Sequence, residues 1–395
     1  MYNRLSDMDL EGKKVIVRAG FDVPLDEKGN ITDDKRIKAV LPTINILLEK
    51  KAKVIIISHN GRPDGKIVEN LNMDSCAKRL GELLSKEVKK LDECIGEKVK
   101  EETNLMKEGE IIVLENLRFH KEEKDDDDDF AKELASLGDY YVNEAFPVSH
   151  RKQASITGIP KYIPGIAGMQ LEKEIDIIKG LIENPEKPYV AILGGAKVSD
   201  KVELIKAQLE NVDNLLLGGA MIFTFFKAQG KEIGKSLCED DKIELARELL
   251  KDEKLVLPED VIVGDKFSDS SYANNVNVDD IKNNEIGLDI GERSIERYKE
   301  ILKDAKTIVW NGPLGKFEEE RFAKATDEIA SFVSGLDAKV VIGGGDSALA
   351  IEQSGHADQI THISTGGGAF MKFLEKKTLV GIEALEESYE KFKQE

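Results

Sequence analysis

Short apolar runs alternate with amphipathic stretches along the whole chain. Runs of this kind have the composition of strands buried on both faces of a sheet. In the first half they are Lys14–Arg18, Val54–Ser58, Ile111–Leu114 and Tyr140–Asn143, and in the second half Tyr189–Leu193, Asn214–Leu217, Thr307–Trp310, Val340–Ile342 and Gln359–Ile363. Between the runs, apolar positions recur at helical spacing, as in Lys35–Lys50 and Met73–Leu84. The pattern therefore predicts strands and helices in alternation.

Alternation of this kind predicts an α/β protein with parallel sheets covered by helices on both faces. Two series of strands in 395 residues predict two doubly wound, Rossmann-like domains joined by a helix. The stretch Gly168–Ile182 has helical spacing, and Asn184-Pro185 should end that helix. We expect one domain at 1–167 and a second at 168–379, which includes the connecting helix. The tail 380–395 has a helical pattern and is expected to pack back on the first domain.

Composition and charge exclude several classes of protein. The chain has 41% hydrophobic and 34% charged residues, as in globular proteins, and its apolar runs are too short to span a bilayer. Because Met1–Leu10 carry no apolar signal region, we expect a cytoplasmic protein without a membrane partner. The net charge of −19 argues against nucleic-acid binding. Three distant cysteines predict packed thiols, not disulfides or a thiolate metal site.

The run of five aspartates at 125–129 has two interpretations. Consecutive carboxylates cannot all point at one metal ion, so we favour a solvated loop. Such a loop would bring negative charge to the start of the following helix.

Four glycine-rich turns follow strands of the second half, where a parallel sheet binds its ligands. They are Gly194-Gly195-Ala196-Lys197, Gly218-Gly219-Ala220, Gly343-Gly344-Gly345-Asp346 and Gly366-Gly367-Gly368. Glycine lets the backbone approach a phosphate, and the N–H groups of the next helix attract the anion. Tight packing of strand on helix is the alternative for any one turn. Four such turns favour a nucleotide site.

The kind of nucleotide site is less determined. An ordinary P-loop is absent. The turn at Gly343 satisfies the loose Gly-x-Gly-x-x-Ala dinucleotide pattern, which keeps an NAD-type dehydrogenase as an alternative, although this turn stands near the end of the chain. A protein that binds phosphometabolites without turnover is a further alternative.

Cations are placed beside these turns and at the strand ends of the first half. Lys197 and Lys201 share one face of a helix start, where positive charge opposes the helix dipole unless an anion binds. In the first half, arginines and histidines at strand ends predict a phosphate-binding patch, with surface ion pairs as the alternative. This set comprises Arg18, Arg36, Arg62, Arg118, Arg151, His59, His120 and His150.

Five motifs, in the same order, resemble the phosphoglycerate kinase family over nearly the whole chain. They are Ser58-His59-Asn60-Gly61-Arg62-Pro63-Asp64, Leu114-Glu115-Asn116-Leu117-Arg118-Phe119, Leu193-Gly194-Gly195-Ala196-Lys197-Val198-Ser199-Asp200-Lys201, Trp310-Asn311-Gly312-Pro313 and Gly343-Gly344-Gly345-Asp346. The resemblance implies phosphoryl transfer between 1,3-bisphosphoglycerate with ADP and 3-phosphoglycerate with ATP. It also implies Mg²⁺ as cofactor, a monomer, and domains that close over the reactants.

The resemblance also implies site residues. Contacts to the triose would come from Arg18, Asp22, Arg36, His59, Arg62, Arg118, His150 and Arg151. Catalysis would involve Arg36, Lys197, Gly367 and Gly368. The nucleotide would be held by Lys197, Lys201, Gly218, Gly219, Asn311, Glu318, Gly344, Gly345, Asp346 and Ser347, with Asp346 engaging the magnesium.

The first strand departs from the family pattern Arg-x-Asp-Phe-Asn-x-Pro, because Gly20 and Asp22 stand at its aspartate and asparagine. Asn60, Glu144 and Pro147 are further departures in the triose half. A family member with altered acceptor specificity is therefore an alternative. Since strand alternation would place Arg18, Gly20 and Asp22 on one side, we expect Asp22 to supply the displaced carboxylate.

Overall fold

The computed structural model describes residues 1–268 and 270–393, so the last two residues of the predicted tail helix lie outside the described residues. The chain forms two compact units, Met1–Ile177 with Thr378–Glu395, and Ile178–Lys377. The division falls within helix α6 (Met169–Glu183), later than the predicted boundary after residue 167. The first turn of α6 is hydrogen-bonded to Thr43 and Glu144, which fixes it to the first unit.

The first unit contains a seven-stranded parallel sheet of order β1-β7-β6-β2-β3-β5-β4. Its strands are β1 (Asn3–Arg4), β2 (Lys14–Ala19), β3 (Lys53–Ile57), β4 (Lys89–Lys90), β5 (Ile111–Val113), β6 (Tyr140–Glu144) and β7 (Gly165–Ala167). Its helices are α1 (Lys35–Glu49), α2 (Asp74–Leu84), α3 (Glu97–Asn104), α4 (Lys121–Lys124), α5 (Asp128–Ala135) and α14 (Val380–Phe392). Successive residues Val15, Ile16 and Val17 are all fully buried. Since they point to opposite faces, both faces of this sheet are covered.

The second unit contains a six-stranded parallel sheet of order β10-β9-β8-β14-β15-β16. Its strands are β8 (Tyr189–Leu193), β9 (Asn214–Leu217), β10 (Leu255–Val256), β14 (Thr307–Asn311), β15 (Lys339–Gly343) and β16 (His362–Ile363). Its helices are α7 (Val202–Asn211), α8 (Ile222–Ala228), α9 (Ile243–Leu249), α10 (Glu292–Leu302), α11 (Lys324–Ser334), α12 (Gly345–Gln353) and α13 (Gly367–Lys376). In chain order this is the 3-2-1-4-5-6 arrangement of Rossmann folds, which confirms the predicted fold class.

A second, antiparallel sheet in this unit was not predicted. It has the order β12 (Asn274–Asn277), β11 (Asp260–Gly264), β13 (Ile286–Ile290). The prediction for β16 was also too long, because residues Ala357–Gln359 form a helical turn and the strand is only His362–Ile363.

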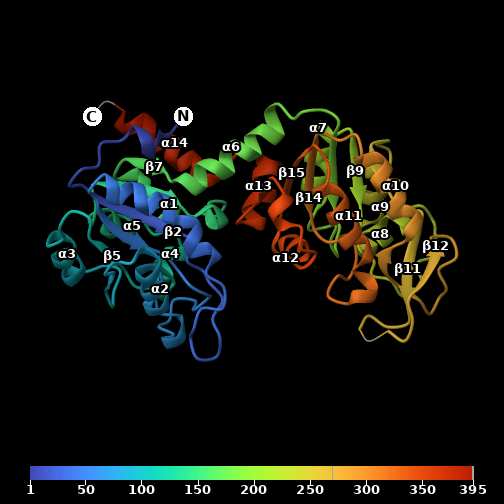
Figure 1. Ribbon diagram of the computed structural model, residues 1–395, viewed down its shortest axis with the longest axis horizontal. Helices are drawn as coiled ribbons and strands as arrows, with labels where there is room; N and C mark the ends of the chain where they lie inside the picture. Colours follow the sequence, from blue (N-terminus) through green and yellow to red (C-terminus); the bar gives the residue numbers. More distant parts are fainter. Residues whose placement is uncertain (269, 394–395) are drawn as a thin grey trace. The chain divides into compact units, whose positions relative to one another are not determined.

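The two ends of the chain meet in the first unit. Helix α14, at the red end of the colour scale, lies near β7 and the N-terminus (Figure 1). Ser388 Oγ accepts a 2.9 Å hydrogen bond from the N–H of Gly165, and the N-terminal amine lies 3.1 Å from Glu386. The aspartate run forms a short loop at 125–127 and continues into the first turn of α5, which brings negative charge to the helix start as predicted. The Asp127 carboxylate caps α5 by accepting from Phe130 N–H.

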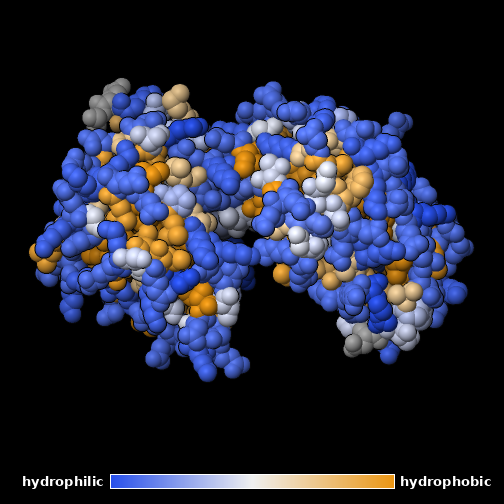
Figure 2. Space-filling model, viewed as in Figure 1, coloured by the Kyte–Doolittle hydropathy of each residue, from blue (hydrophilic) through white to orange (hydrophobic). Residues whose placement is uncertain are grey.

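The face of the molecule in Figure 2 is mostly hydrophilic, as the high content of charged residues predicts. Among the described residues, no helix is both long enough and apolar enough to cross a membrane.

Candidate functional site

A cationic cavity of about 210 Å³ lies beyond the carboxyl ends of the strands in the first unit. It forms near the switch between β2 and β6, where a doubly wound sheet opens a crevice. Its lining contains six of the eight residues predicted to contact a triose: Asp22, Arg36, His59, Arg62, Arg118 and Arg151, together with Gly20, Pro147 and Val148. The start of α1 and the turns after three strands thus bring four arginines to one place.

Arg18 does not line this cavity, which corrects its prediction as a substrate contact. Its side chain is fully buried, and each guanidinium nitrogen has a partner inside the unit. Nε donates to Ser155 Oγ at 2.8 Å, Nη1 to the carbonyl of Ala19 at 2.6 Å, and Nη2 contacts His59 Nδ1 at 2.8 Å. Glu123 lies 4.0 Å from Nη2. A group held in this way is not available to a ligand.

His150 is also absent from the lining of the cavity. It adjoins it through Arg151, whose Nε lies 3.2 Å from His150 Nε2. His120 is elsewhere, 3.5 Å from Glu93 and against the ring of Phe130.

Asp22 is the one carboxylate in the lining of the cationic cavity. Its Oδ2 lies 3.4 Å from Arg36 Nη1 and 3.7 Å from His59 Nε2, while Oδ1 accepts a 2.9 Å hydrogen bond from Gly61 N–H. Partial burial acts to raise the pKa of Asp22, but these partners together hold it well below its usual range. Asp22 is therefore ionised and tied to the cations of the cavity.

The cations of this cavity outnumber their partners. Arg118 is almost fully buried; its Nη1 donates to the Gly61 carbonyl at 2.8 Å, and its Nε has no hydrogen-bond partner among the described residues. Burial, followed by the charge of Arg18, lowers the pKa of Arg118 to about 10. Arg62 is exposed, and no ion pair to it is present in the described part of the chain. An anionic ligand would satisfy these groups.

A second cavity of about 210 Å³ lies in the second unit, by the turns after β8, β9 and β14. Three of the predicted nucleotide residues, Gly219, Glu318 and Asp346, line it. Its walls are largely apolar and come from Ile222, Phe223, Leu288, Leu314 and Phe317. A cleft with apolar walls and polar groups at its rim suits a flat aromatic base. Leu288 was not predicted, because it lies in β13 of the antiparallel sheet, which was itself not predicted.

The glycine-rich turns pack directly against one another. An added Cβ at Gly219, whose φ is +68°, would lie 2.4 Å from the backbone nitrogen of Gly195. A Cβ at Gly367 would lie 2.5 Å from the Cα of Gly344. Some of these glycines thus serve close packing, whereas Gly345 at the start of α12 faces open space, with nothing within 4 Å of an added Cβ. The same turns can therefore both pack tightly and admit a ligand. Neither α12 nor α13 has a side-chain cap, so their first N–H groups remain open for an anion.

The two predicted lysines differ in their surroundings. Lys201 is partly buried, and its ammonium contacts the side-chain oxygen of Asn311 and, at 3.2 Å, the sulfur of Met371. Burial lowers its pKa. Lys197 is exposed and has no ion pair within the described residues. Asn311 also donates to the carbonyl of Gly343, and Ser347 Oγ accepts from Gly312 N–H at 2.6 Å, which ties β14 to the start of α12.

A preformed metal cluster is not present: no three His, Cys, Asp or Glu side chains in the described residues are arranged to hold an ion. Asp346 is exposed in the first turn of α12 and lines the nucleotide cavity, without an ion pair in the part of the chain that the structure describes. Magnesium commonly takes one or two carboxylates and completes its shell with phosphate oxygens and water. Asp346 fits a magnesium ion of that kind.

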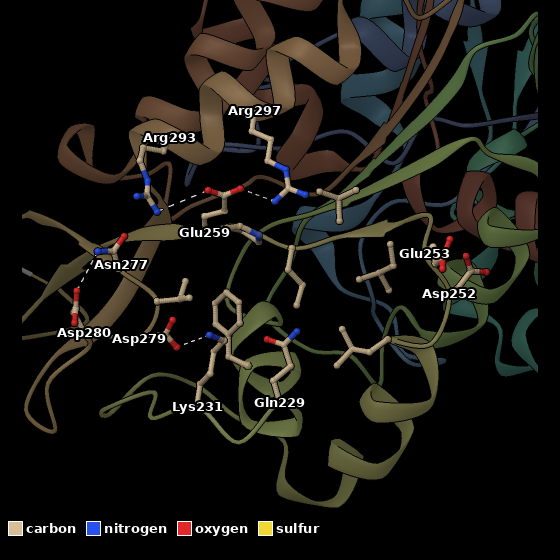
Figure 3. Close-up of a pocket in the computed structure, with 17 residues that line it drawn as sticks. Gln229, Lys231, Asp252, Glu253, Glu259, Asn277, Asp279, Asp280, Arg293 and Arg297 are labelled. Carbon is tan, nitrogen blue, oxygen red and sulfur yellow. Dashed lines mark hydrogen bonds and ion pairs between the residues drawn. The ribbon is translucent and has the colours of Figure 1, made fainter.

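A third cavity, of about 560 Å³, contrasts with the cationic one (Figure 3). Arg293 and Arg297 both turn toward Glu259, at 3.8 and 2.8 Å, and Lys231 pairs with Asp279. Because these cations already have carboxylate partners, this cavity does not attract an anion as the first one does.

The fold and the two cavities define a class: a two-unit α/β protein with one cavity beside the glycine-rich turns of a Rossmann-type sheet and one cationic cavity that suits an anion. Comparison with known proteins gives the family. The family model of phosphoglycerate kinase matches residues 5–377. The chain belongs to the phosphoglycerate kinase family, and with this membership come kinase activity and a place in glycolysis. This result decides against the dehydrogenase alternative.

Individual relatives cover nearly the whole chain. It is 49% identical over 393 residues to the phosphoglycerate kinase of Gloeothece citriformis (97% of this chain, 98% of that one) and 50% identical over 389 residues to that of Dictyoglomus turgidum, with the same coverage. Among solved structures, the phosphoglycerate kinase of Coxiella burnetii matches with a TM-score of 0.90 and 38% identity over 98% of this chain and 99% of that one. The Pyrococcus horikoshii enzyme matches with 0.85 and 34% over 99% and 100%.

Proposed function

We propose that this chain transfers a phosphoryl group reversibly between 3-phosphoglycerate and MgATP, as a cytoplasmic monomer. The main support for 3-phosphoglycerate as acceptor is the cationic cavity. Its lining contains one carboxylate, that of Asp22, and four arginines: Arg36, Arg62, Arg118 and Arg151. Four cations against one anion suit a ligand with a phosphate and a carboxylate. His59 adds a neutral polar group to the same wall.

In the second unit we assign the apolar cavity to the adenine ring, with Gly218, Gly219 and Asn311 beside it and Glu318 toward the ribose. Lys201 would contact the nucleotide phosphates together with the open N–H groups at Gly344, Gly345 and Ser347. Burial lowers the pKa of Lys201, which supports this role, because an ammonium held partly out of water gains from an anionic partner. Asp346 would hold Mg²⁺, which when bound neutralises charge on the phosphates.

The reaction needs no general base, because the acceptor carboxylate is already ionised. What the chain supplies is alignment and neutralisation of the charge that spreads over the transferring group. Lys197, exposed and without an ion pair in the described residues, is free to follow that group. Arg36 would stabilise it from the acceptor side, and the N–H groups of Gly367 and Gly368 at the start of α13 would stabilise it from the donor side.

The acceptor end of the site has a local departure that affects specificity. An ideal Cβ at Gly20 would meet only Pro147 Cδ, at 4.0 Å, so the space of the missing side chain is open. Asp22 lines the same cavity, and we propose that its carboxylate takes over the contact to the 2-hydroxyl group. Its contacts with Arg36 and with the N–H of Gly61 would then serve to orient it.

A coupled assay tests the proposed activity. Purified protein with 3-phosphoglycerate and MgATP should form an acyl phosphate, followed through a dehydrogenase that consumes this product. Chelation of magnesium should stop the reaction. Binding of ATP without turnover above the no-enzyme blank would refute the proposed acceptor and favour a changed substrate.

A further inference from the structure

The buried Arg18 has a direct contact with one wall of the cationic cavity. Its Nη2 lies 2.8 Å from Nδ1 of His59, while the other ring nitrogen of His59, Nε2, is on the side of Asp22 at 3.7 Å. His59 lines the cavity although it is only 2% exposed. Arg18 therefore contacts the Nδ1 edge of the His59 ring, whereas the Nε2 edge lies on the side of the ligand cavity.

The chemistry of this contact fixes the proton on the ring. A guanidinium has five N–H donors and no acceptor, so His59 Nδ1 must accept with its lone pair. A neutral imidazole that accepts at Nδ1 carries its hydrogen on Nε2. A protonated ring would instead point an N–H at an N–H of Arg18.

Burial and the charged groups around His59 together keep the ring neutral. Burial contributes most, the positive charges of Arg18 and Arg118 act in the same direction, and the carboxylate of Asp22 opposes them; together they lower the pKa of His59 to about 3. Arg36, which pairs with Asp22, adds a further cation nearby. His59 therefore offers a donor without a charge.

Arg18 is itself held in place by a network of buried hydrogen bonds. Ser155 Oγ accepts from Arg18 Nε and donates to Glu123 Oε1 at 2.6 Å, and Ser155 N–H donates to Glu123 Oε2 at 2.9 Å. Tyr141 adds a hydrogen bond from its hydroxyl to the Ser155 carbonyl, at 2.7 Å. Glu123 and Arg18 are both fully buried, so each charge depends on the other.

We propose that Arg18 is a positioning residue that holds His59 as its neutral Nε2–H tautomer, so that the ring donates a hydrogen bond to the triose ligand. The inference rests on the proposed function, since it needs a triose phosphate in this cavity. It gives the first-strand arginine a role that acts through its neighbour and not through contact with the ligand.

The tautomer can be measured without any turnover. The full-length protein labelled with ¹⁵N-histidine contains five histidines, and loss of one signal set in His59→Gln assigns His59. Long-range ¹H–¹⁵N spectra should show an unprotonated Nδ1 and a protonated Nε2 that stay constant from about pH 5.5 to 8, the range in which an ordinary histidine titrates. A proton on Nδ1, or titration near pH 6.5, overturns the inference.

The role of Arg18 needs a variant that still folds. Arg18→Met alone would leave Glu123 as an unpaired buried charge, so the test is Arg18→Met with Glu123→Gln. The matched control is Arg18→Lys, which keeps a cation beside Glu123 and a donor without an acceptor beside His59. In the control, the His59 spectrum should equal that of the wild type. In the double variant, His59 should show both tautomers, because Nδ1 no longer faces a donor that requires it to accept. A spectrum unchanged from that of the control would overturn the inference.

Binding of 3-phosphoglycerate, measured by calorimetry, completes the test. Its Kd should rise about ten-fold or more in the double variant relative to the control, the effect of one hydrogen bond to a charged group, while the Kd for ATP stays the same. Equal Kd values for 3-phosphoglycerate, or a change for ATP as well, overturn the positioning role. If the wild type binds 3-phosphoglycerate but shows no turnover, the proposed function fails while this inference is still judged by the spectra and the Kd.

Discussion

Glu144 is a buried carboxyl group whose protonation should make the stability of the first unit depend on pH. It stands at the end of β6 and is 2% exposed. Oε1 accepts from Thr43 Oγ1 at 2.5 Å and from Gln170 N–H at 3.0 Å, and Oε2 accepts from Leu171 N–H at 3.2 Å. An added Cβ at Gly168 would lie 2.1 Å from Oε2, so the pocket around this carboxyl is closely filled. Glu144 thus caps the start of α6 from inside the core.

Burial and capping act on this group in opposite directions. Burial is the larger effect and disfavours the carboxylate, while the three hydrogen bonds favour it; the result is a pKa raised from 4.5 to about 7. Since the folded pKa is above the unfolded one, the stabilisation is complete below about pH 4.5 and is lost as the pH rises through 7. A difference of this size corresponds to roughly 3 kcal/mol.

Glu144→Gln removes the titration and keeps an oxygen that can accept from the start of α6. Denaturant midpoints of wild type and variant should be compared from about pH 5 to pH 8, with the exposed Glu133→Gln as control for the change in net charge. The wild type should lose stability relative to Glu144→Gln across this window, by up to roughly 3 kcal/mol, and Glu133→Gln should follow the wild type. Parallel curves for wild type and Glu144→Gln would refute the reasoning, because Glu144 would then be ionised throughout.

Three further predictions concern the reaction. Lys197→Ala should lower kcat by about 10²–10³ with little change in either KM, as expected for a contact made in the transition state. The control Lys206→Ala, at a surface lysine 3.7 Å from Glu203, should change neither kcat nor KM. A near-normal kcat for Lys197→Ala would make Lys197 a surface charge only. Asp346→Asn should raise the magnesium concentration that gives half-maximal activity, whereas the exposed Asp358→Asn should not; equal magnesium dependence would exclude Asp346 as a ligand. Asp22→Ala should weaken the binding of 3-phosphoglycerate more than the binding of an analogue without the 2-hydroxyl, by roughly 1–3 kcal/mol. Equal losses of binding free energy for the two ligands would leave Asp22 as a partner of Arg36 alone.

Most strands of the two parallel sheets could be predicted because fully buried strands have nearly continuous apolar sequences. Tyr189–Leu193 is such a run, and its five residues are all buried in β8. The short strands β1, β4, β7 and β10 were missed. The antiparallel sheet could not be found in this way. Its edge strand β12 (Asn274–Asn277) is mostly exposed, so no apolar pattern marks it, although it pairs with the preceding strand β11. Leu288, which β13 contributes to the wall of the second cavity, was missed together with this sheet.

Side-chain alternation predicted the orientation of site residues only within a strand. Arg18, Gly20 and Asp22 were expected to face one side because side chains alternate along a strand. That rule holds only within the strand, and β2 ends at Ala19. Arg18 is therefore still part of the sheet and turns into the core, while Gly20 and Asp22 belong to the turn and line the cavity. Residue type and position near a strand end identified the cationic site, but whether a given arginine meets the ligand or supports a neighbour depends on the residue at which the strand ends.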